Sequence, residues 1–564
     1  MADGIDFRKY VLPDPNNVFV ARMHRGNLDV TIESSIAQGR LSGGAETVSS
    51  MARRYDQAIN YWTASEDTNF ETHQLPISFS GNRNNVVVAI NGDYTYKDEN
   101  NNPVWGIPAR GQIHSSWYAK RFTNLESGSG FVWKRDRSVF IGECIVHPYP
   151  PKEYPDLNRK QIVTYYKTGV NQLFNGINVP RGNDDFIIYT PQYDKETLTD
   201  GTGIEVLVEL HDPFLIRPEP SMITGVIKAI YDGVGSNFIP FDHVVLSASG
   251  VAKDEMLEHQ IEIGDEIGIS QEIRHLEENC ETPLNIYDWT HTYASIGGSY
   301  YFLKDGEVRG YFHKSQAIVR HPRTAVAYDD DFIYFIIVDG RNPGISRGMT
   351  IYELGVFTKY VLGVNHAIAQ DGGGSSTMVV NGEVVNNTFC NNVFCKANIY
   401  LPLVQKSLIP QNQQIENTDY SKNSTELINV LEPLTNQLNQ VSYELMAIQR
   451  LVPNGLMMVV VEPMEKIERF SPGDEVVTIS DANIRLGPGT NYSFIATVRD
   501  RDLIGTIVAH TNQLDGVFAK GYYWWKVSFM IDGKEVVGWM ADSLLADPEE
   551  LNAQYQELIE SKLR

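Results

Sequence analysis

One glycine-rich stretch combines backbone and side chains that could bind an anion. Residues 367–382 read AIAQDGGGSSTMVVNG, so three glycines follow Asp371 and two serines follow the glycines. Glycine leaves backbone N–H groups uncovered, and the hydroxyls of Ser375 and Ser376 add two donors. This composition suits a phosphate, and a tight turn between two strands is the structural alternative. The three glycines are Gly372, Gly373 and Gly374.

The same stretch departs from two well-known catalytic patterns. A P-loop would end in Gly-Lys-Ser/Thr, and a nucleophile elbow would read G-x-S-x-G. Residues 373–377 read GGSST, which satisfies neither pattern. We therefore expect neither a P-loop nucleotide site nor an elbow serine here.

Many strand-like segments surround this stretch. Runs of β-branched and aromatic residues recur between residues 15 and about 402. The dipeptide Asn381-Gly382 predicts a two-residue hairpin turn, because both residues accept positive φ. These signals predict an α+β fold with a large mixed or mostly antiparallel sheet system. The expected strands are 18–23, 85–90, 186–190, 205–210, 243–249, 332–338 and 377–386.

Helical signals are fewer than strand signals. Thr350 and Glu353 form a capping-box pattern at the start of a helix that we expect to stop at Gly363. Residues 46–62 predict a second helix.

Composition and charge limit the class of protein. The chain has 564 residues, 71 acidic against 47 basic, and a formal net charge of −24. Such a surface repels phosphate backbones and anionic lipid, so nucleic-acid binding is not expected. The longest near-continuous apolar run, residues 456–461, is far shorter than the roughly 18 residues of a membrane span. We expect a soluble chain of three or four domain-sized units.

The N-terminus and the cysteines bear on the compartment. Residues 1–15 lack the apolar core of a signal peptide, so the protein either stays inside the cell or has lost a leader. Cys390 and Cys395 could close a small disulfide loop in an oxidising compartment, or they are two unrelated thiols. A four-cysteine zinc site is not expected, because the spacing does not match one.

The chain changes character twice beyond residue 402. Residues 403–423 are polar and rich in Gln and Asn, which indicates a linker. Apolar residues then alternate at spacings of four and three over 427–452, the pattern of a coiled-coil seam. A helix over 424–453 would hold a homo-oligomer together, or it would pack on its own chain. Pro433 weakens the pattern near its start.

A separate small domain is expected over residues 465–547. About five short strands with glycine-rich turns predict a small β-barrel. ANIRLGPGTNYSFIATV (482–498) and GWMADSLL (538–545) resemble a bacterial SH3-type domain. This resemblance implies attachment to cell wall, glycan or protein, without chemistry of its own. Residues 548–564 predict a charged C-terminal helix.

Four segments resemble the phosphodiester glycosidase family, and they follow the family's order. The family includes N-acetylglucosamine-1-phosphodiester α-N-acetylglucosaminidase, the uncovering enzyme, and bacterial exopolysaccharide-associated proteins. The resemblance spans residues 15–402 and implies hydrolysis of the glycosidic bond of a sugar-1-phosphodiester. The segments are VVVAINGDY (86–94), SIGGSYYFLKDGEV (295–308), HPRTAV with VDGR (321–341) and DGGGSSTMVVNGEVVN (371–386).

The resemblance implies roles for several charged residues. Arg323 and Arg341 are expected to bind phosphate, because a guanidinium is a bidentate partner for it. A carboxylate is needed beside the anomeric carbon and to activate water, and Asp371 and Asp339 are the first candidates, followed by Asp93. As structural alternatives, Asp339 and Asp93 could cap turns, and Arg323 could be an ion-pair partner.

Two asparagines and one departure complete the expected site. Asn91 is expected to fix sugar hydroxyls, and Asn398 fits the asparagine that follows the glycine loop in the family. An arginine-proline pair would be expected near Cys395-Lys396 but does not occur there, which leaves the role of that arginine open. Residues 144–290 are expected to form an inserted β region that contributes to the substrate wall.

Together these features predict a secreted or cell-surface hydrolase. The expected substrate is a GlcNAc-1-phosphodiester-like molecule or a phosphate-containing polysaccharide. We expect no required cofactor, and a bound Ca²⁺ or Mg²⁺ stays open. The alternative is a protein that holds glycan, cell wall or biofilm matrix without cutting it. A peptidoglycan hydrolase would need a Cys-His or zinc constellation near 465–547, which the sequence lacks there.

Overall fold

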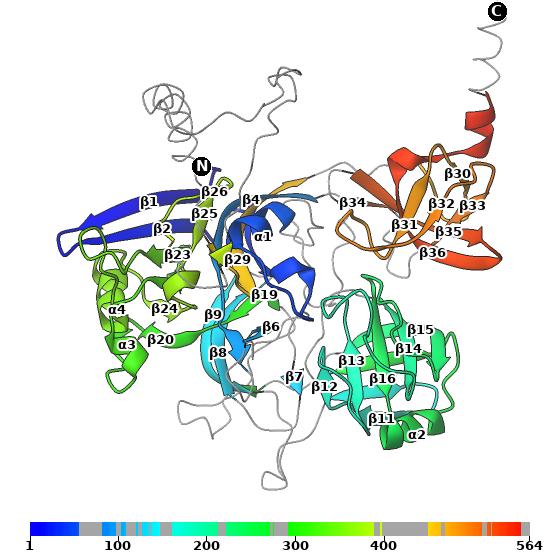
Figure 1. Ribbon diagram of the computed structural model, residues 1–564, viewed down its shortest axis with the longest axis horizontal. Helices are drawn as coiled ribbons and strands as arrows, with labels where there is room; N and C mark the ends of the chain where they lie inside the picture. The colour runs from blue at the N-terminus through cyan, green and yellow to red at the C-terminus, as the bar shows by residue number, and fades with distance from the viewer. Residues whose placement is uncertain are drawn as a thin grey trace, which may run out of the picture.

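The computed structural model describes most of the chain outside a few long segments. The described residues form a sheet-rich unit, an inserted β domain and a C-terminal β domain (Figure 1). Among the described strands, β12 and β13 form the one parallel pair, in agreement with a mostly antiparallel sheet system. The described residues are 1–55, 82–97, 103–108, 120–121, 127–134, 137–146, 161–211, 222–270, 274–275, 292–388, 395–396, 449–463, 469–509, 516–519 and 522–553.

A seven-stranded sheet lies at the centre of the sheet-rich unit. Its strand β23 is apolar throughout because both faces are buried: Phe335 and Ile337 face one core, and Ile336 and Val338 face the other. Its strands, in spatial order, are β1 (Ile5–Leu12), β2 (Asn16–His24), β23 (Phe332–Val338), β22 (Arg323–Tyr328), β24 (His366–Ala369), β20 (Ser299–Lys304) and β21 (Glu307–Val308). The helices on the second face are α3 (Ser315–Ile318) and α4 (Ile351–Tyr360).

A five-stranded sheet covers the first face, and it contains a strand from far along the chain. Residues 456–461 belong to β29, which pairs with β3 and β4 in the middle of this sheet. The expected boundaries of 15–402 are therefore too narrow at both ends, since β1 also lies in the unit. In spatial order the strands are β26 (Glu383–Val384), β25 (Met378–Val380), β4 (Asn82–Asn91), β29 (Asn454–Pro463) and β3 (Val30–Ile36), and α1 (Val48–Tyr55) packs on them.

Smaller sheets complete this unit. A four-stranded sheet closes one side of the first core, to which Phe131 and Ile296 belong. Its strands are β18 (Arg274–His275), β9 (Val139–Val146), β8 (Ser127–Lys134) and β19 (Thr292–Gly297). The two-stranded sheets are β5 (Thr95–Lys97) with β6 (Pro103–Pro108), and β27 (Cys395–Lys396) with β28 (Gln449–Arg450). A short 3-10 helix, η1 (Ala37–Gly39), follows β3.

The inserted domain is a nine-stranded sheet with its own core. The helix α2 (Gly250–Glu258) packs on it, and Met256 joins the buried cluster of the sheet. In spatial order the strands are β11 (Val170–Leu173), β10 (Ile162–Tyr165), β17 (Glu266–Ser270), β15 (Ile223–Asp232), β14 (Ile204–Leu210), β16 (His243–Ala248), β13 (Phe186–Tyr189), β12 (Gly176–Ile177) and β7 (Lys120–Arg121).

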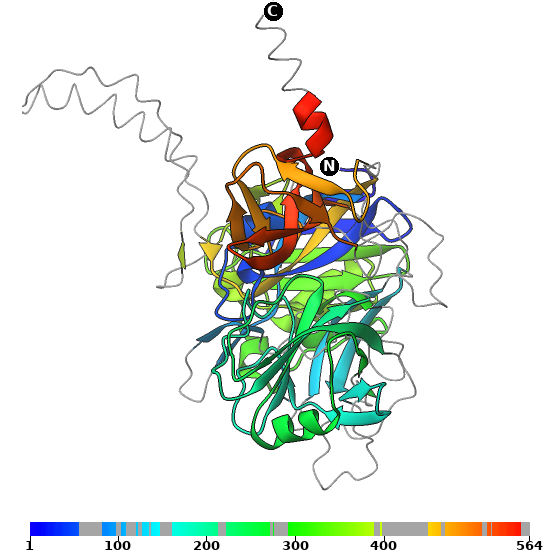
Figure 2. The same ribbon diagram turned by 90° about the vertical axis from the view of Figure 1, so that its right-hand side faces the viewer.

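The C-terminal β domain packs beside the inserted domain (Figures 1 and 2). The ring of Phe241, from the inserted domain, lies edge-on to Trp539 with 5.1 Å between ring centroids. The backbone N–H of Phe241 donates to the Leu486 carbonyl. The strands of the C-terminal domain, in spatial order, are β32 (Phe494–Val498), β31 (Ala482–Arg485), β36 (Lys534–Ala541), β35 (Tyr522–Ile531), β33 (Gly505–Ile507), β30 (Glu475–Thr478) and β37 (Leu545–Ala546). The strand β34 (Val517–Ala519) also pairs with β35, and the 3-10 helix η5 (Asp542–Leu544) precedes β37.

A buried ionic group lies in this interface. The Lys526 ammonium, from the C-terminal domain, donates to the carboxylates of Glu209 and Asp242 of the inserted domain. The Lys526 side chain is 8% exposed, and those of Glu209 and Asp242 are 1% and 0% exposed. We call these three residues the interdomain cluster. The C-terminal domain is thus fixed to the inserted domain by specific contacts; its SH3-type character stays a prediction.

Two local predictions are confirmed. Val380 and Glu383 pair across Asn381-Gly382, and both turn residues have positive φ. Thr350 caps α4 through both hydrogen bonds of a capping box with Glu353. Residues 548–553 are helical, as expected for the start of the C-terminal helix.

The predicted helix over 424–453 is wrong at its C-terminal end. Gln449 and Arg450 form the strand β28, and Val452 bridges to Glu46. Val452 is buried in the first core, so its apolar side chain serves the sheet and not a coiled-coil seam. Residues 401–448, which include the expected linker, lie outside the described residues, and self-association through them stays a prediction.

Cys144 is disulfide-bonded, and its partner lies outside the described residues. The side chains of Cys390 and Cys395 lie outside them as well, so the small disulfide loop stays a prediction. Over the described part of the chain, no helix combines the length and apolar character that a membrane span requires.

Candidate functional site

The family-like segments converge at one end of the seven-stranded sheet. Arg323 begins β22 and lies opposite Val338, the last residue of β23. Ala369, the last residue of β24, pairs with Ala325 on the neighbouring strand. The loops that carry Asp339 and Asp371 therefore leave the sheet at the same end where Arg323 enters it.

Asn91, at the end of β4, is hydrogen-bonded to two other family-like segments, 321–341 and 371–386. Its amide Nδ2 donates to the Asp371 carbonyl (2.7 Å), and its Oδ1 accepts from the hydroxyl of Thr324 (2.8 Å) and the N–H of Thr377 (3.2 Å). The residue is 0% exposed. Asn91 thus positions the backbone around Asp371, while its predicted contact with sugar hydroxyls remains a prediction.

Asp371 is the half-buried carboxylate of this site. Its Oδ2 accepts from the Ser375 hydroxyl at 2.5 Å, and its N–H donates to the Gly92 carbonyl. Burial raises the pKa of Asp371 to about 6, although the Ser375 hydroxyl, the charge of Arg450 and the Gly372 N–H act in the opposite direction. A carboxyl group with this pKa changes protonation state close to neutral pH.

The glycine loop, residues 372–374, packs closely on its surroundings. Its Gly373 N–H donates to the Pro322 carbonyl (2.9 Å), so this backbone donor already has a protein partner. Gly373 has φ 66°, and a Cβ there would lie 3.0 Å from Nη2 of Arg341. Any larger residue would therefore strain the backbone and crowd the arginine.

The two predicted phosphate-binding arginines have different surroundings. Arg341 is exposed and lies beside Gly373, where a ligand could reach it. Arg323 is 6% exposed, and it donates to the carbonyls of Met349 (2.8 Å) and Val319 (2.6 Å). Burial lowers the pKa of Arg323. Arg323 therefore fastens α3 and the start of α4 to the sheet, whereas Arg341 lies at the surface.

Asp339 is buried and holds the segment that follows the hairpin. It is 3% exposed, and Oδ1 accepts from the Asn386 amide (3.2 Å) and the Asn387 N–H (3.0 Å). Burial raises the pKa of Asp339 to about 6, and these two donors partly offset the effect. The arrangement favours a positioning role for Asp339 over contact with substrate.

The remaining predicted residues lie deeper. Asp93 is 0% exposed, and its Oδ1 accepts from the Tyr94 N–H (2.7 Å) as in a capped turn. Ser376 is 2% exposed and accepts from the Thr324 hydroxyl. Asn398 lies outside the described residues.

Arg450 and Asn454 belong to the site but were not predicted. β28 packs beside the glycine loop, and the charge of Arg450 acts on Asp371. Its neighbour Gln449 is fixed on the other side by two hydrogen bonds with Ser49. Asn454 accepts from the Asp93 N–H through Oδ1 (2.8 Å). No local sequence pattern marked these two residues, because the apolar run at 456–461 that follows them indicates burial but not which strands it pairs with.

Three non-glycine residues near the site have left-handed backbone. Tyr300, Tyr311 and Arg341 have φ values of 50°, 49° and 61°. The register of β20 also shifts next to Tyr300, between Ser299 and Tyr301. Positive φ is uncommon for a bulky residue such as tyrosine, and irregular strand pairing is frequent next to functional sites.

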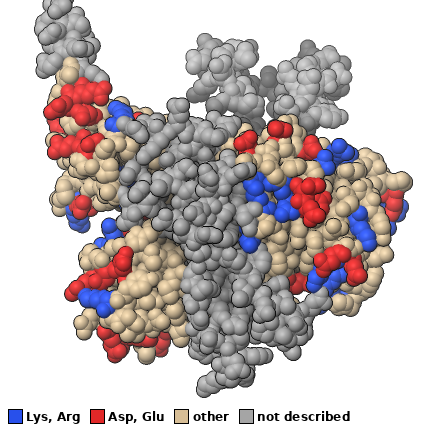
Figure 3. Space-filling model, turned by 180° about the vertical axis from the view of Figure 1, so that it is seen from behind, with Lys and Arg blue, Asp and Glu red and all other residues tan. Residues whose placement is uncertain are grey.

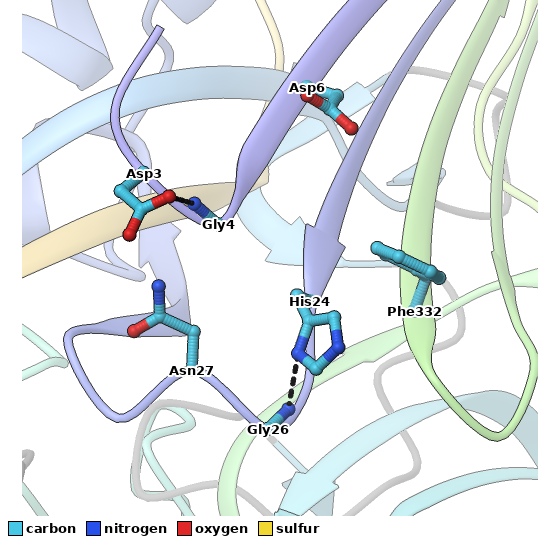
Figure 4. Close-up of a pocket in the computed structure, with 7 residues that line it drawn as sticks. All are labelled: Asp3, Gly4, Asp6, His24, Gly26, Asn27 and Phe332. Atoms are coloured by element: carbon cyan, nitrogen blue, oxygen red, sulfur yellow. Dashed lines mark hydrogen bonds between the residues drawn. The ribbon is translucent and has the colours of Figure 1, made fainter.

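A surface pocket of about 470 Å³ lies at the opposite end of the same sheet (Figure 4). It is lined by His24, where β2 ends, and by Phe332, where β23 begins. His24 accepts from the Gly26 N–H, and Asp3 accepts from the Gly4 N–H. The length of β23 separates this pocket from the motif residues, so it is not the predicted site.

The described charges on one face of the molecule do not mark a second site. On the face seen in Figure 3, acidic and basic side chains are interspersed over the described surface. Within the described ranges, no three His, Cys, Asp or Glu side chains are grouped so that they could hold a metal ion.

Comparison with known proteins identifies a domain within the chain. The model of the phosphodiester glycosidase family matches residues 234–399, which include Arg323, Arg341 and Asp371 but neither Asn91 nor Arg450. No curated protein matches the chain.

Three solved structures are similar at low identity. A hypothetical protein from Synechocystis is 14% identical with a TM-score of 0.40, and the match covers 81% of this chain and 62% of that one. An exported-protein candidate from Burkholderia pseudomallei K96243 is 16% identical with a TM-score of 0.40, covering 66% and 70%. The catalytic domain of zebrafish N-acetylglucosamine-1-phosphodiester α-N-acetylglucosaminidase is 14% identical with a TM-score of 0.25, covering 68% and 75%.

The chain spans less than two thirds of the Synechocystis protein's length. Residues 234–399 match the model of the phosphodiester glycosidase family, and the motif residues within this range converge at one end of the sheet. This part of the chain is therefore similar to a phosphodiester glycosidase domain.

Proposed function

We propose that this protein hydrolyses the glycosidic bond of sugar-1-phosphodiesters, either GlcNAc-1-phosphodiester-like molecules or phosphate-containing polysaccharide. One observation carries the proposal. Asp371, a half-buried carboxylate with its pKa raised to about 6, directly precedes a glycine loop, and this loop lies beside Arg341 and beside the strand that carries Arg450. Hydrolysis of a sugar phosphodiester requires a cationic group that binds the phosphate and a carboxylate near the anomeric carbon.

The chemistry of the leaving group explains the arginines. Cleavage between the anomeric carbon and oxygen releases a phosphomonoester, which is a good leaving group without strong protonation. Binding its charge matters more, and guanidinium groups form strong charge-assisted pairs with phosphate. Arg341 and Arg450 would supply this binding, while Arg323 keeps the loop between β22 and α3 in position.

The carboxylate of Asp371 would act on the sugar side of the bond. Positive charge develops at the anomeric carbon in the transition state, and a nearby carboxylate stabilises it or takes a proton from the attacking water. The Ser375 hydroxyl orients this carboxylate through its 2.5 Å hydrogen bond. At pH 7, above its pKa of about 6, Asp371 would be mostly ionised.

We further propose that the protein works outside the cytoplasm. The disulfide of Cys144 supports an oxidising compartment, because disulfides are rare in cytosolic proteins. The C-terminal domain would then hold the enzyme near wall or glycan, but as a rigid part of the molecule, since the interdomain cluster fixes it to the inserted domain.

Turnover of methyl α-GlcNAc-1-phosphate diester tests the proposal. The protein should release GlcNAc and methyl phosphate, and Asp371→Asn should lower kcat by about 10²–10⁴-fold with a thermal unfolding midpoint no lower than that of the wild type. Affinity for the diester without release would instead support the alternative of a protein that binds glycan or matrix. Near wild-type activity of the variant would remove Asp371 from the mechanism.

A further inference from the structure

Two exposed aromatic rings contact each other close to the candidate site. Phe312 precedes α3 and is 68% exposed, and Tyr352 lies in the first turn of α4 and is 44% exposed. Their ring centroids are 5.5 Å apart and their planes are tilted by 43°. We call these two residues the aromatic platform.

The platform is built on the same backbone as the site. Arg323 binds the carbonyl of Val319 in the segment after α3, and it binds the Met349 carbonyl just before α4. Met349 also exchanges two backbone hydrogen bonds with His321, which precedes the family-like arginine. Both ends of the platform are therefore tied to the strand that enters the site.

A second aromatic pair lies next to Phe312 along the chain. Tyr311 is the residue before Phe312, and its ring contacts that of Tyr300 with centroids 5.1 Å apart. Tyr300 in turn interacts electrostatically with Arg323. Tyr300 and Tyr311 thus connect the segment that carries Phe312 to the buried Arg323.

The size and rim of the platform fit a sugar ring. Two aromatic side chains with these exposures offer roughly 200 Å² of surface, far below the roughly 800 Å² per partner of a stable protein interface. Ligand sites combine such apolar faces with a few polar groups. Glu353 follows Tyr352 on α4, and its ion pair with Arg320, from the segment between α3 and β22, offers partners for hydroxyl groups.

We propose that the aromatic platform binds a further sugar residue of the substrate chain, one that lies outside the bond being cleaved. This inference rests on the proposed function, since it assigns a polymeric substrate to the same site. The apolar face of a pyranose packs on the rings, while its hydroxyl groups remain in water or meet the bordering ion pair. The platform thereby favours oligomeric phosphodiesters over single-unit ones.

The test compares two probes, methyl α-GlcNAc-1-phosphate diester and a trimer of GlcNAc units joined by 1-phosphodiester bonds. The quantity measured is the ratio of kcat/KM for the trimer to kcat/KM for the methyl diester. In the variant Phe312→Ala/Tyr352→Ala this ratio should fall about tenfold. Tyr360→Ala is the matched control, because Tyr360 lies on α4 and is 72% exposed but is at the far end of the helix. It should leave the ratio within about twofold.

An unchanged kcat/KM ratio in the folded double variant would overturn the proposal that the aromatic platform binds a sugar residue. If the wild-type protein hydrolyses neither probe, the proposed function fails, and calorimetric titration with the trimer still tests the platform. A Kd about tenfold higher for the double variant than for wild type would support it. Equal Kd values would reject it. The thermal unfolding midpoint of each variant verifies that it folds.

Discussion

Two regions of this molecule bury charged groups, and they treat them in opposite ways. In the interdomain cluster, Lys526 contacts both Glu209 and Asp242, so each charge has an opposite charge beside it. At the candidate site, the Asp371 carboxylate has one side-chain hydrogen bond, from a neutral serine. Arg450 acts on it from a neighbouring strand without a direct ion pair among the described contacts.

The pKa values follow this difference. Burial favours neutral Glu209, but Lys526 outweighs it, so the pKa of Glu209 lies below its ordinary value. Burial also lowers the pKa of Lys526, and the two carboxylates more than reverse this. At Asp371 and Asp339 burial prevails, and each pKa rises to about 6. Pairing stabilises charge for the fold, whereas incomplete pairing keeps a carboxylate able to exchange a proton.

Removing the central charge of the interdomain cluster should have the largest effect on stability. Lys526→Ala leaves the buried Asp242 carboxylate without this cation, and it leaves Glu209 with the half-exposed Lys228 as its ion-pair partner. This should lower the free energy of unfolding by about 3–5 kcal/mol. Urea unfolding at pH 7 measures this. The folded fraction should retain its kcat for the methyl diester, because the cluster lies in another interface.

The matched control removes every charge of the interdomain cluster. Lys526→Met combined with Glu209→Gln and Asp242→Asn should recover much of the lost stability, since no unpaired charge then remains. If the triple variant is as unstable as Lys526→Ala, packing and not charge pairing holds the two domains together.

The arginines of the site should also differ in whether they serve ligand binding or the fold. Arg341→Ala and Arg450→Ala should each lower kcat/KM for the methyl diester by about 10–100-fold, since charge-assisted bonds contribute about 1.5–3 kcal/mol. Binding of neutral GlcNAc, measured by calorimetry, should change far less. Equal losses for the diester and the neutral sugar would remove phosphate binding from their role.

Arg323→Ala provides the contrast to these two variants. It leaves the Met349, Val319 and Gln316 carbonyls without their donor, so we expect a loss of stability as well as of activity. A fully stable Arg323→Ala protein with impaired phosphate binding would restore the sequence-based prediction that Arg323 contacts phosphate.

Asp339→Asn should show the opposite pH dependence from a paired carboxylate. Because the pKa of Asp339 is raised to about 6 in the folded protein, the folded state binds more protons between its ordinary value of 3.8 and about 6, and stability falls as pH rises through this window. The stability of the variant relative to wild type should therefore rise as pH increases from about 4 to about 7, by up to about 3 kcal/mol in total. A pH-independent difference in urea unfolding would contradict this.

Ser375→Ala should have the smallest effect. The Ser375 hydroxyl lowers the pKa of Asp371, so its removal should raise the pKa seen in the pH dependence of kcat/KM by up to about one unit. Ser376→Ala is the control, since Ser376 bonds Thr324 and not the carboxylate. A shift of the same size in both variants would mean that the loop, and not the hydroxyl, sets the pKa.

The sequence predicted the elements whose signals are local. The hairpin at Asn381-Gly382 and the cap at Thr350 depend on residues a few positions apart, and both are present. The position of residues 456–461 could not be predicted in this way. An apolar run shows that a segment is buried, but not that it pairs with β3 and β4 across more than 350 residues of chain.

At the candidate site, too, the sequence revealed local motifs but not contacts between distant segments. Asp371 and Arg341 lie within family-like motifs, and the structure brings their loops together. Arg450 reaches the glycine loop only because β29 returns to the five-stranded sheet, so no local pattern indicated it. The motif around Arg323 was visible, yet its orientation toward backbone carbonyls depends on how α3 packs, which sequence alone does not reveal.

The pH dependence of kcat/KM for the methyl diester tests the central claim most directly. The phosphodiester does not titrate between pH 4.5 and 8, roughly, so a limb in this range belongs to the protein. We predict that activity rises with pH through a pKa of about 6, that His321→Asn keeps this limb, and that the residual activity of Asp371→Asn lacks it. A flat profile in the wild-type protein, or an unaltered limb in Asp371→Asn, would contradict the assignment of Asp371 as the reactive carboxylate.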